Sequence, residues 1–275
     1  LNRWILSVAI PALTLQYLTR LSLSPSHLLP IGVAWIVFGL GCLWVGLLAP
    51  RLGCDRATTG CLMLMAGLGN TSFVGFPLIH MLYGESGLQI AVLVDQPGTF
   101  LILGTLGLLV AASAGQAAEP LSPGMLARRV LGFPPFVAFL LAIGCQLLSW
   151  QPGGILAQVL SVLGASLAPL ALLAVGLQLR LEPDPELLRP LLLGLSYKLL
   201  LAPLLIWSLY AGGLGLSGEL LEVCVLEAAM GPMITAAIVA GNYQLAPRLA
   251  TLMLAVGVPM SLLTVPLWHA LLTRL

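Results

Sequence analysis

The sequence predicts an all-α membrane protein with about nine spans, and two observations lead to that fold class. First, 59% of the 275 residues are hydrophobic and only 8% are charged, whereas a soluble domain carries roughly a quarter charged residues. Second, apolar stretches that approach the ~20 residues needed to cross a bilayer recur along the whole chain. The net charge of +1 and the lack of a basic run give no reason to expect a nucleic-acid partner.

The predicted spans are separated by short connections rich in Gly, Pro, Ser and charged residues, a composition typical of turns. Because no soluble domain fits between them, residues 1–275 are expected to form a single transmembrane domain. The spans cover residues 3–19, 28–49, 59–82, 87–111, 131–149, 154–179, 189–211, 219–240 and 248–272.

Arginine residues are distributed unequally between the two ends of the spans. The positive-inside rule places the arginine-rich side in the cytoplasm. We therefore expect a protein of the bacterial inner (plasma) membrane with its N-terminus inside and its C-terminus outside. The other side receives only Arg20 and Arg274, whereas the cytoplasmic side receives Arg3, Arg51, Arg56, Arg128, Arg129, Arg180, Arg189 and Arg248.

Two pairs of similar segments indicate an internal repeat. Residues 9–20 (AIPALTLQYLTR) resemble residues 167–180 (LAPLALLAVGLQLR), and residues 94–101 line up with residues 256–263. Spans one to four thus match spans six to nine, and the fifth span has no partner.

The unpaired span implies that a helix preceding Leu1 would complete a five-plus-five arrangement. Because five is an odd number, the two halves would have opposite orientations in the membrane, and such inverted repeats are typical of secondary transporters. Repeat one, which lacks its first helix, covers residues 1–112, and repeat two covers residues 125–275.

One span in each half is interrupted near its middle. The first contains GLGNTSFVGFP (residues 67–77) and the second EAAMGPMITAAI (residues 227–238). A proline inside a helix costs about 3 kcal/mol, and broken helices persist in a membrane only inside protein or beside a watery cavity. Matched interruptions point to a transporter binding site, although each alone is also explained by a proline kink.

Three charged residues are placed deep in the membrane, where a charge is costly. They are Glu227, Asp95 and Lys198, and Thr99 lies four residues after Asp95, on the same helical face. Two acids and one base leave a net charge of −1, which suits one bound cation. A structural salt bridge of Lys198 and an interhelical hydrogen bond of Asp95 are alternatives.

The sequence gives no sign of enzymatic chemistry. An intramembrane protease would need paired aspartates, a Ser–His pair or a metal motif, but Asp95 is the only aspartate within a predicted span. The five cysteines show no metal-ligand spacing and are interpreted as small buried hydrophobic residues. No metal site and no cofactor are expected, apart from a bound Na⁺ or H⁺.

Four motifs together resemble a known family, the bacterial auxin efflux carriers, which include malonate carriers and are related to the plant PIN-type carriers. In chain order the motifs are GLGNTSFVGFPLIHMLYG, VDQPGTFLILGTLG, KLLLAPLL and LEAAMGPMITAAIVAGNYQ. The resemblance implies ten spans in two inverted halves, with two broken helices that cross in mid-membrane, similar to the bile acid:sodium symporters. The first helix of the family has no counterpart here.

The resemblance also implies residue roles. By analogy with the sodium symporters, Glu227 matches a carboxylate that binds a cation, the first crossover contributes Asn70 and Thr71, and Asp95 and Thr99 complete the site. Auxin carriers are not generally treated as sodium-coupled, so proton carriage and a structural role stay open for these acids.

The expected function is therefore secondary active transport of a small organic anion, a carboxylate, coupled to H⁺ or Na⁺. Asp95, Thr99 and Glu227 would serve the coupling ion. The alternative is a passive channel or a transporter-like sensor. The expected partners are the anion and the lipid bilayer, and a homodimer is left open. The substrate would be held by Asn70, Thr71, Pro77, Lys198, Gly231 and Pro232.

Overall fold

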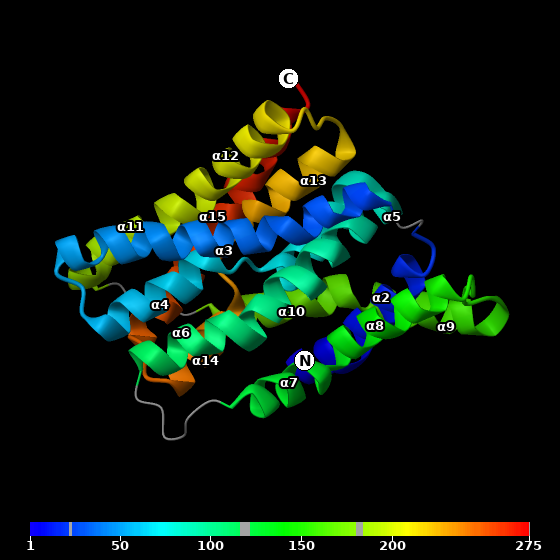
Figure 1. Ribbon diagram of the computed structural model, residues 1–275, viewed down its shortest axis with the longest axis horizontal. Coiled ribbons are helices and arrows are strands. Elements are labelled where there is room, and N and C mark those ends of the chain that lie inside the picture. Colours follow the sequence, from blue (N-terminus) through cyan, green and yellow to red (C-terminus); the bar gives the residue numbers. More distant parts are fainter. Residues whose placement is uncertain (22–23, 116–121, 180–183, 275) are drawn as a thin grey trace.

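The computed structural model of the chain is helical along nearly its whole length (Figure 1). The structure describes residues 1–21, 24–115, 122–179 and 184–274. Within these ranges the only β-type pairing is an isolated bridge between Gly69 and Pro232. The expected all-α fold class is thus confirmed.

The first half of the chain begins with one continuous helix made of α1 (Asn2–Trp4), the π-helical turn η1 (Ile5–Ala9) and α2 (Ile10–Leu18). Gly84, with φ 65° and ψ −145°, interrupts α5, so the chain changes direction there. The elements that follow α2 are η2 (Pro25–His27), α3 (Leu28–Leu48), η3 (Pro50–Leu52), α4 (Arg56–Gly67), η4 (Thr71–Gly75), α5 (Phe76–Val94), η5 (Asp95–Phe100), η6 (Leu103–Gly107) and α6 (Leu108–Ala114).

The second half starts with a helix that the span prediction leaves out, the arginine-bearing α7 (Pro123–Leu131), which meets α8 (Pro134–Leu147) at a bend of 73°. The elements that follow are α9 (Gly154–Ala165), α10 (Leu167–Gln178), η7 (Pro185–Leu187), α11 (Leu188–Ser196), η8 (Tyr197–Leu201), α12 (Ala202–Trp207), η9 (Ser208–Gly213), α13 (Glu219–Ala228), α14 (Ile234–Asn242) and α15 (Pro247–Leu272).

Several helical segments of the described residues are long and apolar enough to cross a membrane. Five pass this test alone: Pro25–Leu52, Thr71–Ala114, Gly154–Gln178, Pro185–Gly213 and Pro247–Leu272. The bent pair α7 and α8 passes it together. The helices α4, α13 and α14 are shorter because their spans are interrupted, as the sequence predicts.

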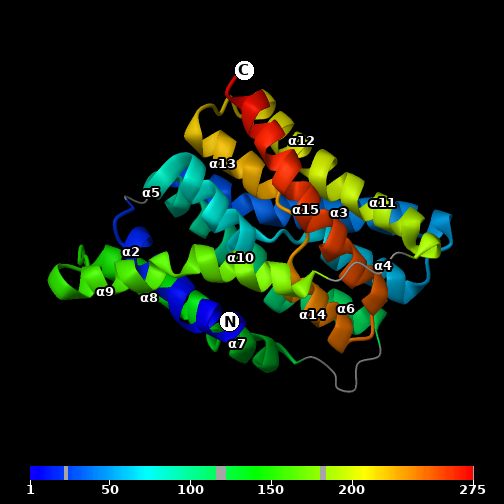
Figure 2. The same ribbon diagram turned by 180° about the vertical axis from the view of Figure 1, so that it is seen from behind.

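The helices form two groups, which both views show (Figures 1 and 2). In one group α2 packs against α8 and α9. In the other, α3 packs against α4, α5 and α13, and α15 packs against α11, α13 and α14. The helices α5 and α10 lie where the two groups meet.

A proline explains why the chain widens into a π-helical turn at η8. Pro203 has no N–H group, so the carbonyl of Leu199, four residues earlier, loses its helical partner. The indole Nε1 of Trp268 on α15 donates to this carbonyl at 3.1 Å. The altered turn carries Lys198, and single π-helical turns are frequent at functional sites.

The start of α4 is capped outside the apolar segments. The Asp55 carboxylate accepts a hydrogen bond from the backbone N–H of Thr58 at 2.8 Å, as an N-cap residue should. Hydrogen bonding by Thr58 lowers the pKa of the Asp55 carboxyl. The cap fixes where α4 begins and hence where it reaches its interruption at Gly67.

Candidate functional site: two interrupted helices that cross

The interruptions of the two broken helices pair with each other. The N–H of Asn70 donates to the carbonyl of Gly231 at 2.8 Å, and the N–H of Met233 donates to the carbonyl of Leu68 at 3.1 Å. Each break thus satisfies backbone groups that the other exposes, which a membrane interior requires.

This pairing explains why a glycine and a proline can stand at the centre of the crossing. Gly69 and Pro232 lie opposite each other, whereas the two hydrogen bonds come from the residues that flank them. Gly69 and Pro232 are therefore a pair without direct hydrogen bonds, in which the backbones approach closely. The missing N–H of Pro232 costs nothing here, since the pairing does not use a donor at that position.

Glycines let the crossing pack directly on α15. A Cβ atom on Gly231 would lie 2.9 Å from the carbonyl oxygen of Gly257 and 2.9 Å from Oγ of Ser261. A Cβ atom on Gly257 would lie 2.6 Å from Cδ of Pro232. Both contacts are shorter than real Cβ contacts, so the close approach depends on glycine at both positions.

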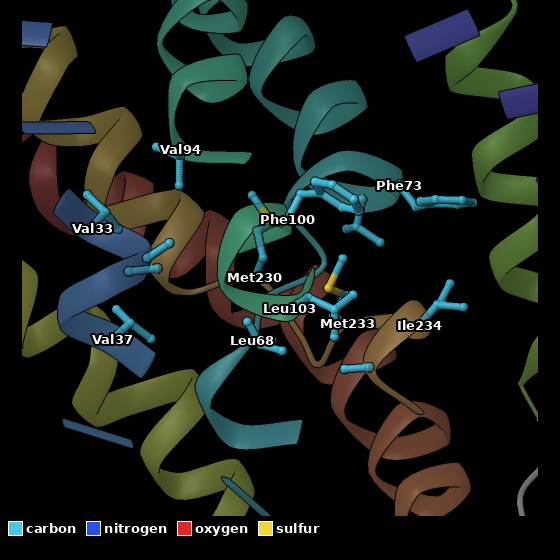
Figure 3. Close-up of a cluster of buried hydrophobic side chains, with 14 of the residues drawn as sticks. Val33, Val37, Leu68, Phe73, Val94, Phe100, Leu103, Met230, Met233 and Ile234 are labelled. Carbon is cyan, nitrogen blue, oxygen red and sulfur yellow. The ribbon is translucent and has the colours of Figure 1, made fainter. Parts of the chain in front are cut away.

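Apolar side chains enclose the crossing, as Figure 3 shows. Leu68 and Met233 lie at the crossing itself, and Val37 of α3 and Leu103 of η6 are further members of the same buried cluster. In such an enclosure polar groups need partners, because burying one without a hydrogen bond is costly. The partners of the three buried charges are therefore informative.

Asp95 is the buried charge with the most partners. Its Oδ1 atom accepts hydrogen bonds from the Thr71 and Ser72 hydroxyls, each at 2.5 Å, and its Oδ2 atom accepts one from Nε2 of Gln96 at 2.8 Å. Asp95 thereby ties η5 to the start of η4, next to the first interruption.

Glu227 has the opposite environment. It is 1% exposed, and neither of its carboxylate oxygens has a hydrogen-bond partner among the described residues. The carboxylate lies over Gly75, where a Cβ atom would be 2.6 Å from Oε2 and 2.7 Å from Oε1. A buried carboxylate with no donor is strongly disfavoured as an anion, so this position suits a group that takes up a cation or a proton.

Lys198 is also 1% exposed. Its Nζ atom donates to the carbonyl of Ala228 at 3.1 Å. Ala228 is the last residue of α13, and the final carbonyls of a helix lack partners and carry the negative end of its dipole. The described residues contain no ion pair within 4.0 Å between Lys198 and either buried acid, so the salt bridge considered above is not formed.

Three cavities lie near these residues. One of about 10 Å³ is lined by Thr71, Thr99, Lys198 and Glu227 together with apolar residues, and a second of about 10 Å³ reaches Ser72, Asp95 and Gln96. Each holds at most one water molecule. A much larger cavity of about 340 Å³ lies between α2, α5, α9 and α10, and its lining includes Tyr17, Pro77 and His80.

The predicted site residues are therefore brought together only in part. Thr71, Thr99, Lys198 and Glu227 share one cavity, and Thr71 links it to Asp95. The backbone of Asn70 and Gly231 makes the crossing, with Pro232 at its centre, and the Nδ2 atom of Asn70 has no partner among the described residues. Pro77 lies apart, on the large cavity.

Four residues of this site are not among the predicted site residues. Ser72 and Gln96 are neighbours of predicted residues, and their polar side chains in apolar spans are a usable signal. Gly69 and Gly75 belong to the predicted interruption, but a glycine alone does not say what it lies against. No cluster of three or more His, Cys, Asp or Glu residues that could hold a metal ion occurs in the described ranges.

A helical bundle whose two broken helices cross around buried charges is typical of membrane transport proteins. A family model described as "Membrane transport protein" matches residues 1–269, and the chain belongs to this family. The predicted resemblance to the auxin efflux carriers is confirmed by this match. The chain is thus a transport protein of the membrane, and its family indicates transport rather than catalysis.

Several similar proteins are likewise named as transporters. An uncharacterized transporter of Methanothermobacter thermautotrophicus is 31% identical over 280 residues, which cover 99% of this chain and 88% of that protein. A Rhizobium meliloti protein named "Putative malonate transporter" is 27% identical over 78% of this chain and 68% of that protein. The Escherichia coli K12 protein "Uncharacterized transporter YfdV" is 26% identical over 97% of this chain and 86% of that protein.

Proposed function

We propose that this protein is a secondary active transporter that moves a small organic anion, a carboxylate, with H⁺ or Na⁺ as the coupling ion. The observation that carries the proposal is the Glu227 carboxylate, which has no hydrogen-bond partner in the described part of the chain and lies beside two interrupted helices that pair at their breaks. A transporter needs a buried site that gains and loses an ion, and interrupted helices supply free backbone groups for ligands.

The anionic substrate is supported by the helix ends. At η4 and at α14 a helix restarts after a break, and N–H groups at helix starts attract anions. One relative is named as a malonate transporter. Asn70 and Lys198 add donors close to the crossing, and Nδ2 of Asn70 has no partner among the described residues. Thr71 lies beside them with its hydroxyl bonded to Asp95.

The large cavity between α2, α5, α9 and α10 supports a route by which the substrate reaches the crossing. Its volume of about 340 Å³ lies at the lower end of the range of small-molecule sites, ~300–1,000 Å³. It reaches Phe76 and Pro77, directly after Gly75 and the Glu227 carboxylate. We take it as the entry route, and the small cavity at Lys198 and Glu227 as the part that opens when one helix group moves against the other.

We also propose that the protein lies in a bacterial inner (plasma) membrane with its N-terminus in the cytoplasm and its C-terminus outside. The arginine distribution supports this orientation, including the pair Arg128 and Arg129 in the last turn of α7.

The experiment that tests the function is uptake of radiolabelled malonate and a panel of other small carboxylates into proteoliposomes with imposed H⁺ or Na⁺ gradients. Glu227→Gln should abolish gradient-driven accumulation because the amide cannot exchange a proton or balance a cation. Exchange of substrate across the membrane without a gradient should persist.

The matched control is Glu186→Gln, which alters an exposed acid at the start of the span that carries Lys198. This variant should accumulate substrate like the wild type. Accumulation by Glu227→Gln at the wild-type level would refute the coupling role. Transport by the wild-type protein that never exceeds equilibration would instead indicate a passive channel.

A further inference from the structure

We propose that Lys198 is a built-in cation: its ammonium group occupies the place at the crossing that a metal cation would take, so the wild-type site takes up no sodium. The inference deepens the proposed function and rests on it for the role of this site in coupling. Whether the ammonium group or a metal ion lies at this position can be measured without a transport assay.

The first step is the position of the ammonium group. Nζ lies 3.1 Å from the carbonyl oxygen of Ala228 at the C-terminal end of α13. Carbonyls at the ends of broken helices are the groups that bind coupling cations in membrane transporters. Nζ would also be 3.0 Å from a Cβ atom on Gly69, which places it directly at the pairing of the two breaks.

The second step is the set of oxygen atoms around that position. The cavity that Lys198 lines also has Glu227, Thr71 and Thr99 in its wall. The Glu227 oxygens have no partner in the described part of the chain. Together with the Ala228 carbonyl, these groups form the oxygen-rich environment that hard cations prefer.

The third step is volume and charge. The remaining cavity of about 10 Å³ holds at most one water molecule, so a sodium ion there would keep no water shell and would have to share the Ala228 carbonyl and the Glu227 carboxylate with the ammonium group. A second cation would also lie against the first in a buried, apolar enclosure, where like charges repel strongly. The ammonium group and a metal ion therefore exclude each other.

The presence of Lys198 bears on which coupling ion this chain can use. Lys198 is part of the turn η8, whose Leu199 carbonyl is bonded to Trp268, so its amine cannot leave the site as a bound metal ion can. Of the two candidate coupling ions, only the proton can bind Glu227 without placing a metal cation beside the ammonium group.

The test is the thermal stability of the purified protein in detergent with 200 mM NaCl, LiCl, KCl or choline chloride at constant pH. The wild-type Tm should be equal in all four salts. Lys198→Ala removes the ammonium group and opens its volume, and its Tm should rise by about 5 °C in NaCl over choline chloride, as expected for an ion bound only to the folded state.

Two further variants fix the location. Lys198→Arg keeps a positive charge at this position, so sodium should not stabilise it. In the double variant Lys198→Ala, Glu227→Gln the sodium effect should be lost, because the carboxylate that faces the ion is gone. Stabilisation of either variant by sodium would overturn the assigned position.

Two results would overturn the proposal itself. One is a wild-type protein that sodium stabilises over choline, which remains decisive even if Lys198→Ala does not fold. The other is a folded Lys198→Ala variant whose Tm is the same in all four salts. Because no substrate is present, failure of the organic-anion assignment leaves the sodium result unaffected, and the two proposals fail separately.

Discussion

At the scale of single residues, Gly75 leaves the space that the carboxylate of Glu227 occupies. The Glu227 oxygens occupy the volume that any larger side chain at position 75 would need. The end of a glutamate side chain is flexible, so a methyl group there should displace the carboxylate without unfolding the protein. Gly75 is in this sense a positioning residue for Glu227.

Gly75→Ala is therefore expected to lower gradient-driven uptake about tenfold or more, the effect of roughly 1.4 kcal/mol or more, while the purified protein remains monodisperse with a helical circular dichroism spectrum. Uptake into proteoliposomes measures this. The control is Gly144→Ala on α8, where a Cβ atom meets nothing within 4 Å.

A second substitution separates positioning from general packing. Combining Gly75→Ala with Glu227→Asp shortens the acid by one methylene and should restore part of the uptake. Wild-type uptake by Gly75→Ala alone would show that the carboxylate does not need its present place.

At the scale of elements, the crossing of the two broken helices is held by two backbone hydrogen bonds, and their donors are Asn70 and Met233. The proline that marks the second break is not one of the donors. The structure thus separates the residue that interrupts the helix from the residues that join the two interruptions.

A proline introduced at the next position tests whether the hydrogen bonds, and not Pro232, hold the crossing. Met233→Pro removes the N–H that bonds to Leu68 and leaves a buried carbonyl without a partner, at a cost of about 1–3 kcal/mol, so the Tm should fall by about 5 °C. Met233 has φ −75°, a value that proline adopts freely. Its buried side chain is lost as well, so Met233→Ala, which keeps the N–H group, is the control, and the further loss in Met233→Pro reports the hydrogen bond. Differential scanning fluorimetry measures it.

Pro232→Ala is the counterpart, and it should lower the Tm less than Met233→Pro does, since it removes ring atoms that pack on Gly257 but no hydrogen bond. If Pro232→Ala were the more harmful of the two changes, the hydrogen bonds would not be what holds the crossing.

At the scale of the whole molecule, the orientation in the membrane decides which end of the large cavity faces the medium. Tyr17 and His80 line this cavity and lie near the ends of segments that should face outward. With the N-terminus inside, the entry route proposed above opens to the outside.

Cysteine labelling in intact cells tests the orientation. In a background that lacks the five native cysteines, Ser26→Cys and Thr273→Cys should react with a membrane-impermeant maleimide added from outside. Gly124→Cys should react only after the membrane is permeabilised. All three positions are exposed, so accessibility is not limited by packing, and the reverse pattern would invert the assignment.

Much of this architecture can be predicted from the sequence, because its signals are local. The apolar runs identify the membrane class, and the Gly-Pro pair at residues 231–232 marks one interruption. The depth of Asp95, Lys198 and Glu227 follows from their places within apolar runs, and all three are buried. The helix α7 escapes such a prediction because it is short and carries two arginines.

The sequence by itself thus determined that the chain is a helical membrane protein, where two helices break and which charges lie inside, since composition and periodicity reside in neighbouring residues. Only the tertiary structure decided what those charges meet. The bond from Lys198 to Ala228 and the packing of Glu227 on Gly75 join residues far apart in the chain. Such contacts depend on how the helices pack, which no local pattern encodes.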